Sequence, residues 1–211
     1  MMKRTMTTVA AGLLAVVMML GLVACGDSGS GVQLGRGQWS GDTYTNEGAN
    51  ITFKLPSGWT ILSDEEYAAN VQVSTDAMGT AGNAFTEAMQ KAQVLYDTMA
   101  VAPPDAVGNT ANIQIMFENL SVGGRSGWSI VQYLDKMNED LATAAPMFTF
   151  TDSKTGTKTL GGESYTTYEH TEATYGFTQY MCIRKLDSYL ICIMITAFSD
   201  ADITNLLANF S

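Results

Sequence analysis

The segment that most constrains the fold is a nearly unbroken apolar run, YLICIMI, at residues 189–195. A strand at the surface of a sheet alternates apolar and polar residues, because only one of its faces is buried. This run has no polar face, so both of its sides must be covered by other parts of the chain. It therefore predicts a strand at the centre of a sheet, with helices packed on each side.

The other apolar patterns predict further strands and helices around this central strand. The strands are expected at Trp39–Thr45, Ala49–Leu55, Val94–Val101, Ala111–Leu120, Met147–Thr151, Lys158–Leu160, Glu163–Thr171, Tyr175–Lys185 and Tyr189–Phe198. The helices are expected from Ser63 to about Val73, at Gly82–Ala92, at Trp128–Ala144, and after Ser199. Together they predict an α+β protein, a three-layer α/β/α sandwich with a central, mainly antiparallel sheet.

Two serines mark the beginnings of expected helices. Ser63 is followed three residues later by Glu66, which is the pattern of a capping box. Ser199 precedes a stripe of apolar residues at helical spacing, beginning with Ile203 and ending with Phe210.

The N-terminus has the pattern of a secretory signal. Lys3 and Arg4 precede an apolar run at Val9–Ala24, which is shorter than the roughly 20 residues that span a membrane. The run ends in Leu22-Val23-Ala24-Cys25, which resembles the bacterial lipobox. This resemblance implies that residues 1–24 are a signal peptide and that Cys25 carries a diacylglycerol. We therefore expect an extracytoplasmic protein anchored to the cell membrane by lipid.

Residues 25–37 are expected to be a tether, because Gly26–Gly37 contains five Gly and two Ser. No second Gly/Ser-rich stretch follows it. Residues 38–211 are therefore expected to form one domain.

The charge of the chain excludes several classes of protein. It has 11 Lys plus Arg against 21 Asp plus Glu, so it lacks the basic surface of a nucleic-acid-binding protein.

The chain has a single histidine, His170, which argues against a histidine-based metal site or catalytic triad. The strand pattern around it favours a residue on a strand surface. We expect no catalytic residues, no metal and no cofactor.

One loop is a candidate ligand site. In Gly123-Gly124-Arg125, just before an expected helix, backbone N–H groups and a guanidinium could bind an anion on which Trp128 stacks. The alternative is a plain loop with Ser126 as a helix cap. Lys154-Thr155-Gly156 matches an element of penicillin-binding enzymes, but no Ser-x-x-Lys accompanies it, so we interpret it as a hairpin turn.

The two cysteines of the expected domain allow two arrangements. If a three-residue loop joins their strands, Cys182 faces Cys192 and a disulfide becomes feasible. If the turn has two residues, Cys182 faces Ile193 and the thiols lie on opposite faces. We favour two buried thiols that are not bridged.

Aromatic residues gather in the C-terminal strands. They either line a concave surface for a sugar or peptide, or pack in the core, which we favour. They are Tyr165, Tyr168, Tyr175, Phe177 and Tyr180.

The order of elements resembles the PsbP-like fold, the superfamily of the photosystem extrinsic protein and a small Ran-binding import factor. The resemblance rests on Ile51–Trp59, an apolar strand that ends in a Pro-x-Gly-Trp corner. The stretch Gly37–Tyr44 is also similar to small lipoproteins of Gram-positive gut anaerobes that carry this domain. The resemblance implies a fold and carries no activity with it.

These features lead to three hypotheses about function. The first is a non-enzymatic, lipid-anchored surface protein that binds a small ligand or a protein partner. The second is an accessory envelope lipoprotein that supports a transporter or a cell-wall enzyme through protein contact alone. The third is a hydrolase with an acidic site that the sequence does not reveal.

Overall fold

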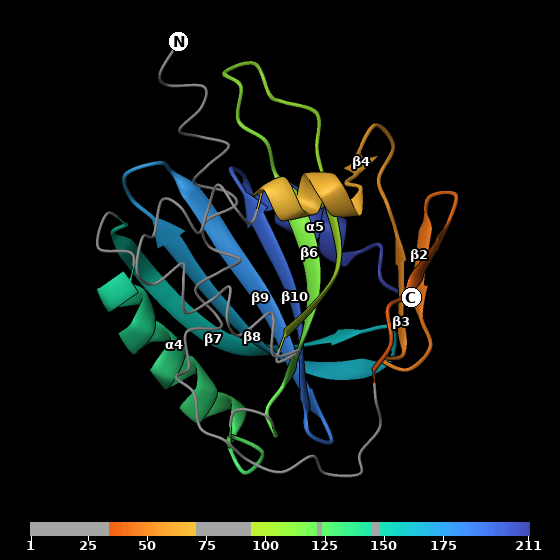
Figure 1. Cartoon of the computed structure of the whole chain (residues 1–211). Helices are drawn as coiled ribbons and strands as arrows, with labels where there is room; N and C mark the ends of the chain where they lie inside the picture. The colour runs from red at the N-terminus through yellow and green to blue at the C-terminus, as the bar shows by residue number, and fades with distance from the viewer. Residues whose placement is uncertain (1–33, 71–93, 122–123, 145–147) are drawn as a thin grey trace.

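The computed structural model describes residues 34–70, 94–121, 124–144 and 148–211 (Figure 1). The signal peptide, Cys25, most of the expected tether and the helix expected at Gly82–Ala92 lie outside these ranges. No helix among the described residues is long and apolar enough to cross a membrane.

A seven-stranded sheet forms the body of the domain, in the order β4-β5-β6-β10-β9-β8-β7. Every neighbouring pair is antiparallel. The strands are β4 (Thr60–Ile61), β5 (Val94–Val101), β6 (Asn112–Asn119), β7 (Phe150–Leu160), β8 (Glu163–Glu172), β9 (Phe177–Leu186) and β10 (Tyr189–Ala197). The apolar run predicted a central strand, and β10 is the fourth of the seven.

Two cores lie on the two faces of this sheet, and β10 contributes to both. Ile191, Ile193 and Ile195 point into one core, whereas Leu190 and Cys192 point into the other. This alternation of fully buried side chains explains why the run has no polar face.

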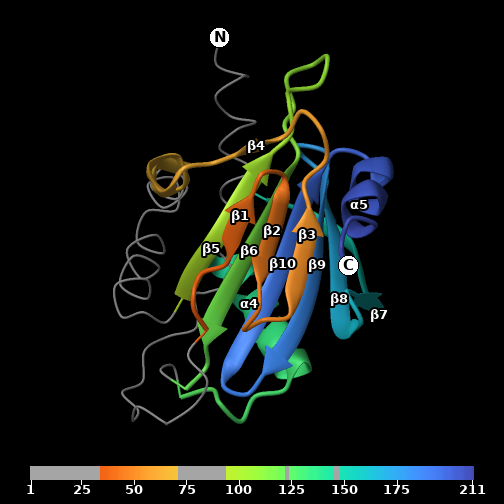
Figure 2. The same cartoon turned by 90° about the vertical axis from the view of Figure 1, so that its right-hand side faces the viewer.

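Different layers cover the two faces. One face carries α4 (Ile130–Ala144) and the helix at residues 64–70, which contributes Tyr67 to its core. The other carries a small sheet of β1 (Gln38–Ser40), β2 (Thr43–Asn46) and β3 (Ile51–Lys54), with α5 (Asp200–Leu207) beside it (Figure 2). The protein is therefore α+β, and the outer layer expected to be helical on this face consists largely of strands.

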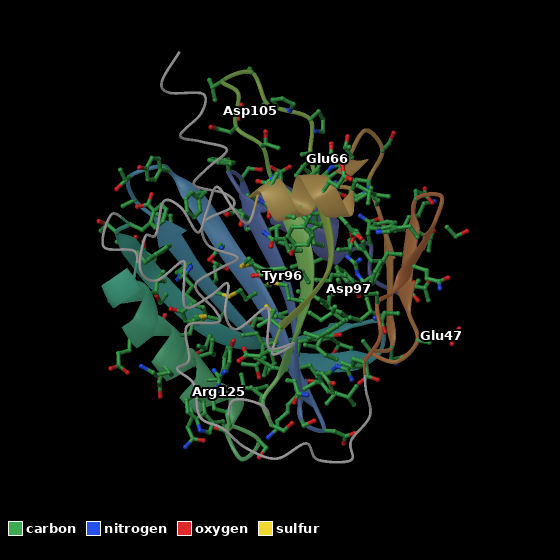
Figure 3. All side chains as sticks on the ribbon, in the orientation of Figure 1. Glu47, Glu66, Tyr96, Asp97, Asp105 and Arg125 are labelled. Carbon is green, nitrogen blue, oxygen red and sulfur yellow. The ribbon has the colours of Figure 1, made fainter. Side chains whose placement is uncertain are left out.

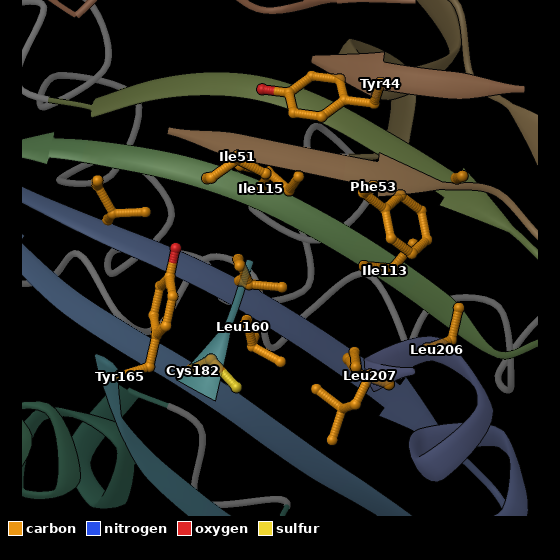
Figure 4. Close-up of a cluster of buried hydrophobic side chains, with 14 of the residues drawn as sticks. Tyr44, Ile51, Phe53, Ile113, Ile115, Leu160, Tyr165, Cys182, Leu206 and Leu207 are labelled. Atoms are coloured by element: carbon orange, nitrogen blue, oxygen red, sulfur yellow. The ribbon is translucent and has the colours of Figure 1, made fainter. Parts of the chain in front are cut away.

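The small sheet covers the large one because its strands alternate. Tyr44, Ile51 and Phe53 are buried in the core between the two sheets, where Leu206 and Leu207 of α5 join them (Figure 4). Phe210 closes this core at the end of the chain, and its ring lies 4.7 Å from that of Phe53.

The sequence predicts a hairpin turn at Lys154-Thr155-Gly156, and this prediction is wrong. The stretch lies within β7, a single strand where two were expected, and pairs with Glu169-Tyr168-Thr167 of β8. The turn falls at Gly161-Gly162, where both residues have positive φ, 55° and 82°, a conformation that glycine adopts without strain.

The arrangement of the cysteines follows from a two-residue turn. Leu186 pairs with Tyr189, so that Cys182 pairs with Ile193 and the two thiols lie on opposite faces of the sheet. Both cysteines are buried and form no disulfide. The disulfide alternative is wrong, and the preference for unbridged thiols is confirmed.

Side-chain caps confirm where helices begin. The amide of Ser63 donates to Glu66 Oε2 at 2.8 Å, and the amide of Glu66 donates to Ser63 Oγ at 3.3 Å. Ser199 caps α5 by accepting from the amide of Asp202 at 3.3 Å. Ser129 and Gln132 form a further capping box. Because Ser129 is the cap, α4 begins at Ile130, two residues after the expected Trp128.

Candidate functional site

The expected tether does not remain separate from the domain along its whole length. Leu34 is buried in the core between the two sheets, and the amide of Gly37 donates to Asp97 Oδ1 at 2.8 Å. A Cβ on Gly37 would lie 2.5 Å from the ring of Tyr44, so only glycine allows this approach. The folded domain therefore includes residues 34–37, which we had assigned to the tether.

Asp97 fixes this segment to the large sheet. The pairing of β5 with β6 shifts between Tyr96 and Thr98, so Asp97 sits at a β-bulge, a feature enriched beside functional sites. Its buried carboxylate accepts from the Gly37 amide, from Asn46 Nδ2 at 3.1 Å and from the Tyr44 hydroxyl. Burial and the neighbouring Asp97 carboxylate raise the pKa of Tyr44.

Arg36 joins the N-terminal segment to the helix at residues 64–70 and to β5. We call this place, formed by Arg36, Asp64, Tyr96 and Asp97, the Arg36 corner. Its guanidinium donates to both carboxylate oxygens of Asp64, at 2.7 and 2.8 Å, and to the carbonyl oxygens of Asp97 at 3.1 Å and Tyr96 at 3.4 Å. The hydrogen bonds and charge of Arg36 lower the pKa of Asp64. Because both side chains remain partly exposed to water, this ion pair is open to exchange with another anion.

Two cavities meet at Arg36. The first, of about 260 Å³, is largely apolar and carries the Arg36–Asp64 pair among its lining residues; the others are Tyr67, Ala68, Val94, Leu95 and Tyr96. The second, of about 330 Å³, is more polar; its other lining residues are Gly35, Gln38, Thr45, Asn46, Glu47 and Gly48. Figure 3 shows Tyr96 and Asp97 next to each other on β5, with Glu47 on the side of the small sheet.

Tyr67 lines the first cavity and is buried in the core that faces α4. Its ring meets that of Tyr96 edge to face, with the ring centroids 5.1 Å apart. Its hydroxyl donates to Gln114 Oε1 on β6 at 3.3 Å. Tyr67, which lines the cavity, therefore contacts the buried polar side chain of Gln114.

Gln114 lies beside a row of buried polar side chains that crosses four strands. His170 of β8 pairs with Gln179 of β9, Gln179 with Thr196 of β10, and Thr196 with Asn112 of β6. Each of the four is at most 1% exposed. We call these four residues the polar row.

The position of His170 differs from the strand surface that we expected. The ring stacks on Phe150 at 4.1 Å, and Nε2 hydrogen-bonds to Gln179 Oε1 at 2.9 Å. Burial lowers the pKa of His170. Its Nδ1 and the Thr196 hydroxyl are buried with no hydrogen-bond partner.

The candidate ligand loop has another role in the structure. Arg125 is buried, and its guanidinium lies 2.5 Å from the carboxylate of Glu118, which also accepts from the Tyr133 hydroxyl at 2.5 Å. Trp128 packs against Arg125, with the guanidinium carbon 5.6 Å from the ring centroid. The charge of Arg125 is thus compensated within the protein by Glu118, and we do not place the ligand site on this loop.

The aromatic residues of the C-terminal strands do not share a surface. Tyr165 and Tyr180 lie with the core that faces the small sheet, whereas Tyr168, Tyr175 and Phe177 lie with the core that faces α4. This division supports packing in the core, the interpretation that we favoured.

Sequence reasoning passed over the residues that the structure brings together. The sequence pattern places Arg36 in a linker and Asp97 in an ordinary strand, and it places Tyr67 in a helix without indicating that its side chain lines a cavity. Among the described residues, no group of three or more His, Cys, Asp and Glu side chains is placed to hold a metal ion.

No family model and no curated protein matches the sequence. The fold is similar to that of cyanobacterial PsbP from Synechocystis sp. PCC 6803, with 12% sequence identity and a TM-score of 0.47, covering 90% of this chain and 98% of that one. It is also similar to a Pseudomonas aeruginosa protein of unknown function, with 10% identity and a TM-score of 0.38, covering 81% and 88%. Neither likeness carries a function to this chain.

Proposed function

We propose that this protein is a non-enzymatic, extracytoplasmic lipoprotein, anchored through Cys25, that binds a small amphipathic molecule at the Arg36 corner of a PsbP-like, three-layer domain. One observation carries the binding proposal. Arg36 stands between an apolar cavity walled by two tyrosines and a polar cavity, so that an apolar group and an anionic group of one ligand both find partners.

The ligand chemistry follows from the lining. Tyr67 and Tyr96 offer aromatic surface to an apolar group, as in most small-molecule sites. A carboxylate or phosphate on the ligand would replace Asp64 on the guanidinium, which presents a planar fork suited to such groups. The cavity of about 260 Å³ suits a small molecule or one end of a longer one.

The anchor would keep this site near the membrane. Leu34, where the described chain begins, is the ninth residue after Cys25, and a fully extended chain of nine residues reaches about 30 Å. The Arg36 corner would therefore meet molecules that are released from the membrane or diffuse along its surface.

A second function, protein contact alone, is favoured by β7. This strand forms an edge of the large sheet, and all of its residues from Thr151 to Thr159 are exposed. A partner could add a strand there, as in other recognition by strand addition. Lys154, Lys158 and a break in pairing after Thr151 are features that protect edges from such pairing, so we place this function second.

The test uses the chain from Gly26 to Ser211 and the probe 3-phenylpropanoate, which joins an aromatic ring to a carboxylate. We expect the probe to raise the melting temperature of this chain, since it binds only the folded state. The increase should be lost in Arg36→Gln and retained in Lys158→Gln, which removes a positive charge at the far edge of the sheet. No stabilisation by the probe at millimolar concentration, or equal stabilisation in both variants, would contradict the proposal.

A further inference from the structure

The second cavity lies where the pairing of β1 with β2 ends. These two strands lie side by side in the small sheet, and Gln38 at the start of β1 pairs with Thr45 (Figure 2). The chain before β1 continues along β2, since Asn46 Nδ2 donates to the carbonyl oxygen of Gly35 at 3.0 Å. The register of the two strands therefore indicates which residues meet beyond the last pair.

Arg36 and Glu47 meet at this cavity. Extending the β1–β2 register by two residues places them opposite each other. Residues two positions apart on a strand point to the same face, so these two side chains share the face of Gln38 and Thr45. All four residues line the cavity, and of its described lining residues only Arg36 and Glu47 are charged.

The charge of Glu47 is not compensated by the described part of the fold. Its carboxylate forms no ion pair or hydrogen bond with another described residue, whereas Asp64, which lines the first cavity, is paired with Arg36. A cationic group in the second cavity would therefore meet a carboxylate that is able to bind it. A ligand with an anionic group at Arg36 can thus carry a cationic group at its other end.

A dipeptide matches this arrangement of cavities and charges. An apolar side chain on its C-terminal residue would fill the first cavity, and its carboxylate would bind Arg36, which lines both cavities. In an extended dipeptide the amino nitrogen lies about 6 Å from the carboxylate carbon, so the ammonium would enter the second cavity. The peptide group between them needs a donor and an acceptor, and the carboxamide of Gln38 offers both.

We propose that the ligand of the Arg36 corner is a dipeptide with an apolar C-terminal residue, whose carboxylate binds Arg36 and whose ammonium binds Glu47. This inference rests on the proposed function, because it identifies the class of small amphipathic molecule that the corner binds. An apolar anion without an amino group would leave Glu47 without a partner.

The experiment compares glycyl-L-phenylalanine with N-acetyl-L-phenylalanine, which lacks only the amino group of the dipeptide. Isothermal titration calorimetry with the chain from Gly26 to Ser211 measures both affinities. The dipeptide should bind about two to five times more tightly, which corresponds to one ion pair at an exposed site. This advantage should decrease at about 1 M NaCl, because salt screens such a pair.

Two variants test the role of Glu47. Glu47→Gln should remove the advantage of the dipeptide, without weakening the binding of N-acetyl-L-phenylalanine. Glu65→Gln is the matched control, because it also removes one exposed carboxylate, next to Asp64 in the sequence, but lines neither cavity. The control should keep the advantage of the dipeptide.

The outcomes separate the two proposals. Equal affinities for the two probes, or an advantage that persists in Glu47→Gln, would overturn the dipeptide as the ligand. Loss of the advantage in Glu65→Gln would also overturn it, because a general effect of charge would then explain the difference. If 3-phenylpropanoate binds and neither of these probes does, the dipeptide is excluded and binding at Arg36 stands. If none of the three binds at millimolar concentration, both proposals fail.

Discussion

The contact between Tyr44 and Asp97 offers a direct test of how the N-terminal segment is held. Tyr44→Phe keeps the ring, which is 0% exposed, and removes only the hydroxyl that donates to the Asp97 carboxylate. Asp97 keeps two donors, Gly37 and Asn46, so the carboxylate loses one of three hydrogen bonds. Hydrogen bonds to charged groups contribute about 1.5–3 kcal/mol, and we expect the free energy of unfolding to fall by that amount.

For a domain of this size, such a loss lowers the melting temperature by roughly 3–12 °C. Urea unfolding followed by circular dichroism measures the free energy, and differential scanning calorimetry measures the temperature. Tyr189→Phe is the matched control, because Tyr189 is a half-buried tyrosine of β10, and it should change stability by less than about 0.5 kcal/mol.

A double-mutant cycle with Asp97→Asn then isolates the pair. We expect the two changes together to cost less than the sum of their separate costs. A Tyr44→Phe protein as stable as the parent, or strictly additive changes, would refute the view that this carboxylate holds the segment in place.

Four further predictions follow from the same contacts. Gly37→Ala should lower the melting temperature, because its Cβ would meet the Tyr44 ring, whereas Gly35→Ala has open space and should not; equal effects would contradict this reading. Glu118→Gln should cost about 3–5 kcal/mol by leaving Arg125 buried without its counter-charge, and a cost below 1 kcal/mol in urea unfolding would be evidence against the buried pair. Because the pKa of His170 is lowered in the fold, stability should decline as the pH falls below about 6.5, where only the unfolded chain takes up the proton. His170→Gln should flatten this part of the pH profile, and an unchanged profile would show that another group is responsible. Burial raises the pKa of Cys182 to about 12, so a thiol reagent at pH 8 should modify it only on unfolding, and rapid reaction of the native protein would disprove its burial.

The fold was predictable where one segment determined its own environment. The apolar run of β10 could be placed at the centre of a sheet because no exposed strand tolerates it. The edge strand β7 was harder, since its sequence TDSKTGTKT is exposed along its length and has the composition of a turn. What keeps it extended is its pairing with β8, which no local pattern reveals.

The polar row and the candidate site were hidden for a related reason. The polar row joins residues from four strands, between positions 112 and 196, and only the register of those strands brings them into line. Asp97 left a weak signal, because it is the only charged residue of the otherwise largely apolar β5. Arg36 left none, since its glycine-rich neighbours are equally typical of a linker.

The central claim is that a small amphipathic molecule binds at the Arg36 corner. An NMR titration of the ¹⁵N-labelled Gly26–Ser211 chain with 3-phenylpropanoate tests it most directly, because each backbone amide reports its own surroundings. We predict that the amides of Arg36, Ala68 and Tyr96 shift with one common dissociation constant, while those of β7 stay in place. Shifts confined to β7, or none at a millimolar concentration of the probe, would contradict the claim.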